Sequence, residues 1–225
     1  MYDFTEGEVL LIDKPYQWTS FDAVKKIRGA ARIKKIGHAG TLDPLATGLL
    51  ILCTGKKTKQ IDTFQGQEKE YTGSMLLGKT TPSIDLETEF DQEFSIEGIT
   101  IEQIRKTIIP FLGTIQQTPP IYSAVRVDGK RAYEIARKGK DATLKERTIF
   151  IKEFELTKVE LPVIEFRLVC SKGTYVRSLV RDFGEALGIG ACMTALRRTR
   201  IGTMHVKDAL TPADFVQSLK AGEPS

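Results

Sequence analysis

The sequence predicts a mixed α+β fold, and its 225 residues suit one large domain or two small ones. Hydrophobic residues make up 41% of the chain, which is enough for a sizeable core. Strand-like and helix-like segments are mixed along the chain without strict strand–helix–strand alternation, which favours an α+β sheet over a doubly wound one. No internal repeat or low-complexity segment is visible.

The N-terminal third begins with a predicted strand and a predicted helix. Residues 8–15, EVLLIDKP, indicate a strand that ends at Pro15. Residues 19–33 indicate a helix with Thr19 or Ser20 as its cap. The residues spaced for its buried face are Phe21, Val24, Ile27 and Ala31.

The stretch IGHAGTLDPLATGLLIL, residues 36–52, holds one carboxylate and one imidazole among small or apolar residues. Asp43 precedes Pro44, an arrangement that suits a helix N-cap, and LATG could form a single helical turn ending at Gly48. Alternatively, Asp43 is a reactive group. No Lys or Arg stands nearby in the sequence to pair with it, and the flanking glycines permit a close backbone approach.

The middle of the chain alternates between predicted helices and irregular segments. Residues 56–65 indicate a short helix, residues 69–79 a strand, and the acidic residues 85–97 an exposed, turn-rich segment. Residues 100–113 indicate a helix with Ile101, Ile104 and Ile108 inward.

The C-terminal half predicts a strand pair at residues 147–161 and 163–173, followed by a helix at residues 174–188. Thr174 can cap that helix, with Tyr175 and Arg177 in its first turn. The apolar residues spaced for burial are Val176, Leu179, Val180, Phe183 and Leu187. A last helix begins at Pro212 behind a Thr211 cap.

Charge is unevenly distributed, although the net charge is only +4. Residues 25–35 carry six basic residues and no acid, and residues 126–140 carry six basic residues and two acids. Arg197, Arg198 and Arg200 form a third cluster. Each cluster alone suits a solvated surface, but the three together, interleaved with aromatic residues, indicate a nucleic-acid partner.

Other classes of site are disfavoured by the composition. Three scattered cysteines without a CxxC pair indicate reduced thiols in a cytoplasmic protein. Two histidines and no cysteine pair make a zinc site improbable, and we expect no metal. The longest apolar runs are too short to span a bilayer, and the N-terminus lacks the basic start of a secretory signal.

The residues alone therefore indicate a nucleic-acid-facing α+β domain with a candidate carboxylate site at Asp43. Arg177 is a candidate partner, because an arginine fork can hold a buried carboxylate ionised. Each residue also has a plain structural interpretation. Tyr71 could be a strand-face aromatic and Tyr175 a half-buried core aromatic, with Arg177 as a surface residue and His38 as a hydrogen-bonded loop residue.

Several motifs in order resemble the tRNA pseudouridine-55 synthases, the TruB family of pseudouridine synthases that modify the T loop of tRNA. The segment GHAGTLDPLATGLL is similar to the family signature. LLIDKP, KEYTG, TPPIYSAVRVDGKRAYEIARKG, CSKGTYVRSLVRDFGEALG and ALRRTRIG also match, so the resemblance runs from about Val9 to Gly202.

The resemblance implies a mixed, mostly antiparallel central sheet flanked by helices. Residues 1–225 would form a single catalytic domain in which residues 115–142 make an RNA-gripping thumb. Family members commonly continue into a C-terminal PUA-type domain, and we expect none here. The partner would be the T-arm stem-loop of tRNA, and we expect a cytoplasmic monomer that needs no cofactor.

The resemblance also implies roles for individual residues. Asp43 would be the catalytic aspartate. Tyr71 would stack on the target base and could act as a proton acceptor, and Arg177 would pair with Asp43. The remaining site residues would be His38 inside the T loop, Tyr175 and Leu196 in the pocket, and Lys14 with Pro15 as supports. Asp85 is the equivalent of a further family aspartate, although Pro82 stands where an acid is common.

The implied reaction converts a tRNA uridine to pseudouridine after the base is flipped out, an isomerisation. Asp43 could attack C1′, add to C6 of the base, or deprotonate C2′, and the sequence leaves these open. Two other classes remain as alternatives: an RNA-binding module that remodels tRNA without catalysis, and a hydrolase that releases free uracil.

Overall fold

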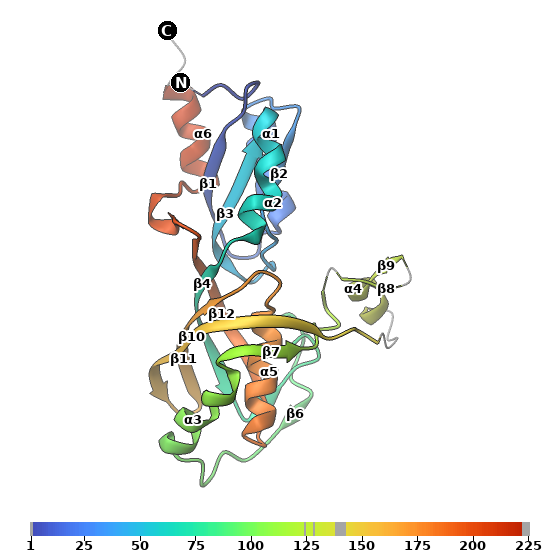
Figure 1. Cartoon of the computed structure of the whole chain (residues 1–225), viewed down its shortest axis with the longest axis vertical. Coiled ribbons are helices and arrows are strands. Elements are labelled where there is room, and N and C mark those ends of the chain that lie inside the picture. Colours follow the sequence, from blue (N-terminus) through green and yellow to red (C-terminus); the bar gives the residue numbers. More distant parts are fainter. Residues whose placement is uncertain (1, 124, 128, 138–142, 222–225) are drawn as a thin grey trace. The chain divides into compact units, whose positions relative to one another are not determined.

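The computed structural model describes residues 2–123, 125–127, 129–137 and 143–221. It divides into two compact units. Unit 1 consists of Met1–Thr72 and Leu196–Ser225, and unit 2 of Gly73–Ala195. The strands β4 and β12, labelled in Figure 1, each contribute residues to both units.

Unit 1 is a small sheet with helices on both faces. Its elements are β1 (Val9–Lys14), α1 (Ser20–Ala30), β2 (Ile36–His38), β3 (Thr47–Thr54), the 3₁₀ helix η1 (Gly55–Gln60), α2 (Ile61–Gly66), the start of β4 (Lys69–Leu77), the end of β12 (Ala191–Ile201), β13 (Met204–His205), the 3₁₀ helix η3 (Val206–Asp208) and α6 (Pro212–Ala221).

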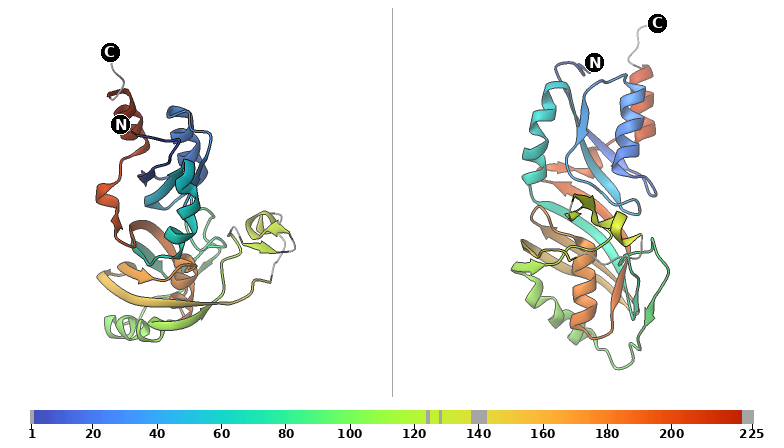
Figure 2. Two further views of the ribbon diagram at one scale, coloured as in Figure 1. Left: turned by 45° about the horizontal axis from the view of Figure 1, so that its top comes forward. Right: turned by 90° about the vertical axis from the view of Figure 1, so that its right-hand side faces the viewer.

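The strand β3 is the centre of unit 1. It pairs antiparallel with β1 and β2 and parallel with β12. Successive side chains of a strand point to opposite faces. Leu50 and Leu52 therefore pack with α1 and α6, whereas Leu49, Ile51 and Cys53 pack with Phe64 of α2. Figure 2 shows the helices on the two faces of these strands. Burial on both faces explains the unbroken apolar run GLLILC.

In unit 2, β10 lies between β11 and β7 and pairs antiparallel with both. The further elements of this unit are β5 (Lys79–Thr80), β6 (Gln92–Glu93), α3 (Ile101–Thr107), the 3₁₀ helix η2 (Ile109–Phe111), β7 (Gly113–Gln117), β8 (Arg126–Val127), β9 (Lys130–Arg131), α4 (Ala132–Ala136), β10 (Arg147–Glu160), β11 (Val163–Cys170) and α5 (Val176–Ala186).

The core of unit 2 contains a cluster of aromatic rings. Phe183 of α5 lies 5.9 Å from the ring of Phe154 on β10 and 6.0 Å from that of Phe111, and Phe154 meets Phe166 on β11 edge to face. Since aromatic pairs of this geometry add to simple burial, the cluster fixes α5 against β10 and β11. The predicted strand pair and this helix are confirmed.

The predicted thumb is described only in part. Its strands β8 and β9 form an antiparallel pair, and α4 follows directly. Ala124, Asp128 and residues 138–142 of the predicted thumb lie outside the described residues.

Several local predictions are wrong for identifiable reasons. Phe21 is 61% exposed, because the buried face of α1 is formed by Ser20, Ala23, Val24 and Ile27. Ile101 is 50% exposed, since α3 buries only Ile104 fully. Thr174 does not cap α5: its hydroxyl donates to the carbonyl of Ser171 instead, and the N-cap position belongs to Tyr175.

The helical turn predicted at LATG is also wrong. Residues 44–45 form a turn closed by the Ala46 N–H donating to the Asp43 carbonyl over 3.0 Å, and the chain then enters β3. Gly48, predicted as the end of that turn, lies inside the strand with φ of +102°. Thr47 and Gly48 belong to β3 instead, because the apolar side chains of this strand are buried on both faces.

Gly48 has room for no side chain. A Cβ there would lie 2.3 Å from the carbonyl oxygen of Arg198 on β12, and the positive φ is unfavourable for other residues. We expect Gly48→Ala to lower the free energy of unfolding by at least about 1–3 kcal/mol, the usual cost of such backbone strain. Urea unfolding followed by circular dichroism measures the change.

Gly29→Ala is the matched control, because a Cβ at Gly29 in helix α1 would meet nothing within 4 Å. Ala in a helix is more favourable than Gly by roughly 0.5–1 kcal/mol, so this variant should be slightly more stable than the wild type. Equal stability of Gly48→Ala and the wild type would contradict the close approach of β3 and β12.

Candidate active site

The candidate site in unit 1 is organised by a row of three residues across three strands. Gly48 on β3 pairs with Lys14 at the end of β1 and with Arg198 on β12. Lys14 is 0% exposed and Arg198 is 1% exposed. Two long cationic side chains are therefore buried on either side of a residue without a side chain.

Lys14 uses its ammonium group to hold three backbone carbonyls. Its Nζ donates to Trp18 over 2.5 Å, to Pro15 over 3.0 Å and to Pro44 over 3.3 Å. An ammonium has three N–H groups, so its donors are fully used. Burial lowers the pKa of Lys14 to about 8, while the nearby Asp43 carboxylate acts in the opposite direction and Arg198 lowers it further. Lys14 is therefore largely charged at neutral pH.

Arg198 holds the other end of the same loop. Its guanidinium donates to the carbonyls of Gly40 over 3.1 Å and Thr41 over 3.5 Å. The Nε of Arg198 donates to the carbonyl of Leu49 over 2.7 Å. The side chain thus joins β12 to β3 and to the loop that precedes it.

Between these cations, the loop bearing Asp43 is anchored residue by residue. The buried Ser20 at the start of α1 accepts a hydrogen bond from the Leu42 N–H over 2.9 Å and donates to the Leu42 carbonyl over 3.2 Å. With Arg198 and Lys14 holding the flanking carbonyls, the backbone is fixed on both sides of Asp43. The carboxylate itself is partly exposed, an arrangement that suits a reactive group presented from a rigid loop.

His38 lies on β2 beside this loop. Its Nδ1 is buried and has no hydrogen-bond partner among the described residues. Burial lowers the pKa of His38 and the charge of Arg198 lowers it further, against an opposing hydrogen bond with the backbone of Gly40. The imidazole is therefore neutral at neutral pH.

Tyr71 and Leu196 lie on neighbouring strands of unit 1, β4 and β12. Both are buried, with exposures of 7% and 8%. The charged residues around them are paired across the same strands: Thr199 donates to Glu70 over 2.8 Å, and Arg200 to Glu68 over 2.9 Å. These contacts fix the pairing of β4 and β12 in this unit.

The predicted site residues of unit 2 form a second buried cluster. Arg177 on α5 is 4% exposed and Asp85 is 2% exposed, and the Nε of Arg177 lies 3.6 Å from a carboxylate oxygen of Asp85. Arg177 also donates to the carbonyls of Ser83 over 3.0 Å and Tyr122 over 2.9 Å. The surface position considered for Arg177 is wrong, because its side chain is buried. The exposure predicted for residues 85–97 is confirmed for residues 86–97 and is wrong only for Asp85.

Tyr175 stands at the start of α5, where Gln117 of β7 fixes its backbone. The Tyr175 N–H donates to Gln117 over 2.8 Å, and the Gln117 amide donates back to the Tyr175 carbonyl over 3.1 Å. The Arg147 guanidinium lies 5.3 Å from the centre of the Tyr175 ring, within cation–π range. The ring is half-buried.

The structure therefore brings Lys14, His38 and Asp43 together in unit 1, and Arg177 with Asp85 in unit 2. The predicted pairing of Asp43 with Arg177 joins residues of different units and stays a prediction.

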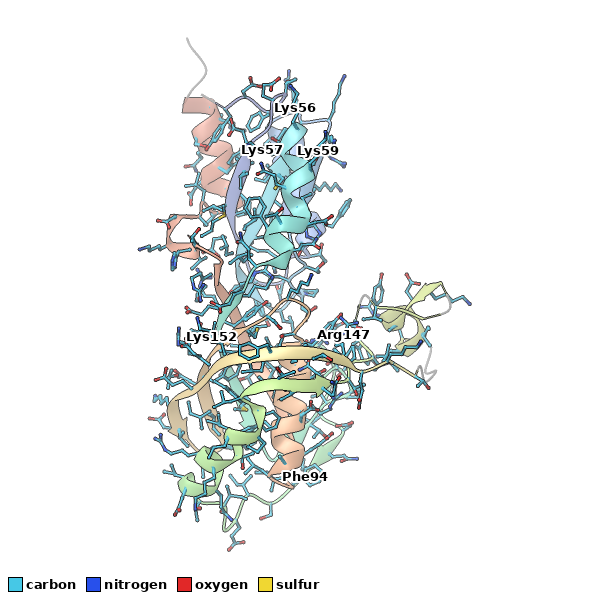
Figure 3. The ribbon with its side chains drawn as sticks, in the orientation of Figure 1. Lys56, Lys57, Lys59, Phe94, Arg147 and Lys152 are labelled. Atoms are coloured by element: carbon cyan, nitrogen blue, oxygen red, sulfur yellow. The ribbon has the colours of Figure 1, made fainter. Side chains whose placement is uncertain are left out.

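Besides Lys14, two residues hold the loop, Arg198 and Ser20, and neither was predicted as a site residue. Arg198 was assigned to a basic surface cluster and Ser20 only to a helix cap, because neither pattern reveals burial. The sequence signal that could have indicated burial of Arg198 was the pair of apolar residues, Leu196 and Ile201, that flank the arginines in a strand. Lys56, Lys57 and Lys59 on η1 were also not recognised as a basic group (Figure 3).

Neither a metal-binding cluster nor a membrane-spanning helix is seen in the described residues. No group of three or more His, Cys, Asp or Glu side chains there is arranged to hold a metal ion. None of the described helices combines the length and apolar character needed to cross a bilayer.

Comparison with known families defines the class of protein. Residues 28–176 match the family described as TruB family pseudouridylate synthase (N terminal domain), and residues 177–223 match the tRNA pseudouridylate synthase B C-terminal domain. The chain belongs to the TruB family of pseudouridylate synthases, which confirms the predicted isomerase class.

Similar curated proteins are of nearly the same length. The tRNA pseudouridine synthase B of Flavobacterium johnsoniae is 54% identical over 225 residues, covering 97% of this chain and 98% of that protein. The protein of the same name from Phocaeicola vulgatus is 52% identical over 228 residues, covering 98% and 97%.

Solved structures confirm the predicted fold. The chain matches a crystal structure of a Cbf5-Nop10-Gar1 complex with a TM-score of 0.74 and 30% identity, covering 95% of this chain and 54% of that one. It matches a structure of an H/ACA RNP bound to a substrate RNA containing 2′-deoxyuridine with a TM-score of 0.72 and 27% identity, covering 99% and 57%. The chain thus spans about half the length of these two chains.

The lowered pKa of His38 can be measured directly, because the chain has only two histidines. In an NMR titration we expect the His38 imidazole to titrate below about 6.5, the ordinary value for His. His38→Gln identifies its signal against that of His205.

The same shift predicts a change in stability with pH. The unfolded chain binds the proton more readily than the folded one, so this group's share of stability is lost as pH falls from about 6.5 toward the folded-state value. His38→Gln should lose less stability on acidification than the wild type. A His38 signal titrating at or above 6.5 would contradict the buried environment.

Proposed function

We propose that this chain converts the uridine at position 55 of the tRNA T loop to pseudouridine, with Asp43 as the reacting carboxylate. The observation that carries the proposal is the loop of residues 40–44, whose backbone is held by buried side chains on both sides of Asp43. Membership of the TruB family supports pseudouridine formation, and the two named relatives support tRNA as the substrate.

The reaction is an isomerisation that balances without a co-reactant. The uridine C1′–N1 bond breaks, the uracil rotates, and C1′ rejoins the base through C5, from which a proton leaves as N1 gains one. Carboxylates attack oxocarbenium-like sugar carbons in glycosidases, so attack of Asp43 on C1′ has chemical precedent. Addition to C6 and proton removal at C2′ remain equally compatible with a fixed carboxylate.

The uridine must leave the stacked loop before it can react. Flipping a nucleotide costs a few kcal/mol. Stacking of the base on Tyr71 would return about 1–3 kcal/mol, so the ring offsets much of the cost. Leu196 on the neighbouring strand would complete the apolar wall, and Tyr175 would line the pocket.

The remaining roles follow the family resemblance. Arg177 would pair with Asp43 in the RNA complex while it keeps the Asp85 carboxylate beside it. His38, neutral and with an unpartnered Nδ1, would enter the space vacated by the flipped nucleotide. Lys14 would support the site, and residues 115–142 would grip the RNA.

We further propose that residues 1–225 act as one catalytic domain and as a monomer. The buried thiols of Cys53, Cys170 and Cys192 are in keeping with the cytoplasm.

Substitution of the carboxylate tests the chemistry. Wild type and Asp43→Asn are each given a T-arm hairpin, and the nucleosides are separated by chromatography. We expect Asp43→Asn to bind the hairpin normally but to lose at least about 10²–10⁴-fold in rate, the contribution typical of a positioned proton-transfer group. A hairpin with cytidine at the target position is the substrate control.

Three outcomes separate the alternatives. A wild type that binds without conversion would indicate a tRNA-remodelling module, and release of free uracil would indicate a hydrolase. Full activity of Asp43→Asn would exclude Asp43 as the reacting group.

The basic surface of unit 1 predicts salt-dependent binding. Lys34 is exposed and follows α1, within the basic residues 25–35. If it contacts a phosphate, Lys34→Ala should reduce the slope of log affinity against log salt by about 0.7–0.9. Binding of the T-arm hairpin at several salt concentrations measures the slope.

Lys106→Ala is the control, because Lys106 is exposed on α3 but paired with Glu102 over 2.7 Å. Its slope should equal that of the wild type. An unchanged slope for Lys34→Ala would remove Lys34 from the RNA contact.

A further inference from the structure

Arg198 has an environment that is unusual for a charged side chain. It is 1% exposed, and its hydrogen-bond partners are the backbone carbonyls of Gly40, Thr41 and Leu49. Among the described residues, no carboxylate lies within ion-pair distance of its guanidinium. Burying a cation without a carboxylate partner is costly, so the site keeps the charge for a reason other than stability.

The surroundings indicate what the guanidinium does. Its three carbonyl partners lie on both sides of Asp43 in the sequence: Gly40 and Thr41 before it, and Leu49 on the strand that follows. A guanidinium is planar and rigid, so three carbonyls held by one guanidinium are fixed relative to one another. The loop therefore cannot shift along β3 without breaking these bonds.

Gly48 makes this contact geometrically possible. It pairs with Arg198 across the sheet, and any Cβ there would strike the Arg198 backbone. The absent side chain lets β12 approach β3 closely enough for the Arg198 side chain to reach under the loop. Lys14, paired with Gly48 from the other side, holds the carbonyl of Pro44.

We infer that Arg198 is a positioning residue for the reaction, which fixes the loop of Asp43 so that the carboxylate stands in register with the flipped uridine. The inference rests on the proposed function of Asp43. Because Arg198 is almost inaccessible, it acts through the loop and does not contact RNA phosphates. Its loss should therefore lower turnover without weakening binding.

The test compares two arginines of the same strand. Arg198→Lys keeps the positive charge, but its ammonium is a single point that cannot span carbonyls on two segments. Arg200→Lys is the matched control: Arg200 is partly buried on the same strand and donates to a backbone carbonyl, that of Gly202, and to Glu68. It makes none of the contacts with the Asp43 loop.

Three quantities are measured for each variant with the T-arm hairpin: the single-turnover rate at saturating RNA, the dissociation constant, and its salt slope. A misplacement of about 1 Å can cost about 10²-fold in rate, so we expect a loss of that order for Arg198→Lys. Affinity and salt slope should match the wild type. Arg200→Lys should retain most of the rate.

A local readout separates positioning from general destabilisation. The Ala46 N–H, bonded to the Asp43 carbonyl, should exchange with deuterium faster in Arg198→Lys than in the wild type. Ile51, buried in the middle of β3, should exchange at the wild-type rate. Faster exchange at both sites, with rate and affinity falling together, would overturn the inference.

A second variant covers the case in which Arg198→Lys does not fold. Ser20→Ala removes only the two hydrogen bonds to the Leu42 backbone, beside Asp43. Ser20→Ala should also lower the single-turnover rate without changing the affinity, and its loss of rate should be smaller than that of Arg198→Lys. If Arg198→Lys folds and its rate is unchanged, the inference is overturned. If Arg198→Lys does not fold, an unchanged rate in Ser20→Ala overturns it.

Failure of the inference and failure of the proposed function give different results. If the wild type forms no pseudouridine, or if Asp43→Asn is fully active, the proposed function fails. If Asp43→Asn is inactive while Arg198→Lys is as fast as the wild type, only the positioning role fails.

Discussion

The structure of unit 1 depends on how closely β12 approaches β3 at Gly48. That approach places Arg198 on one side of the glycine and Lys14 on the other, both buried. The loop before β3 buries Ala39, Leu42 and Ala46, and the two cations hold its backbone carbonyls on either side of Asp43. A partly exposed Asp43 is thereby presented from a backbone that cannot adapt freely.

Such an arrangement is expensive in stability. Two cations are removed from water, and the lowered pKa of Lys14, about 8, reflects that cost. The hydrogen bonds to carbonyls recover part of it. Two packed apolar side chains would destabilise the fold less than two buried cations. They could not fix the loop, however, because only hydrogen-bond donors can hold backbone carbonyls. Sites that need fixed geometry commonly accept this loss of stability.

The sequence predicted well what depends on local pattern. The predicted strand at residues 8–15, the predicted strand pair and the predicted helix of α5 followed from apolar periodicity, and the resemblance supplied the fold. The local rules misled where tertiary packing decides. LATG resembles a capped helical turn, yet its last two residues, Thr47 and Gly48, belong to β3, which is buried on both faces. Phe21 follows a helical spacing but faces solvent, since smaller residues of α1 meet the sheet.

The candidate site divides in the same way. Asp43 and Lys14 were found because their motifs are short and distinctive. The burial of Arg198, Asp85 and Arg177 could not be predicted, because a charged residue in a sequence carries no sign of whether the fold encloses it. The partners of the two arginines are mostly backbone carbonyls, which have no sequence signature at all.

The most direct measurement is a crystal structure of the chain with a T-arm hairpin that carries 2′-deoxyuridine at the target position. We expect an Asp43 carboxylate oxygen within about 3–3.5 Å of a carbon of the extruded nucleoside, as a near-attack geometry requires. The bonds from Lys14 and Arg198 to the loop should be unchanged. A carboxylate turned away from the nucleoside, or a loop released from both cations, would contradict the central claim that a fixed Asp43 performs the reaction.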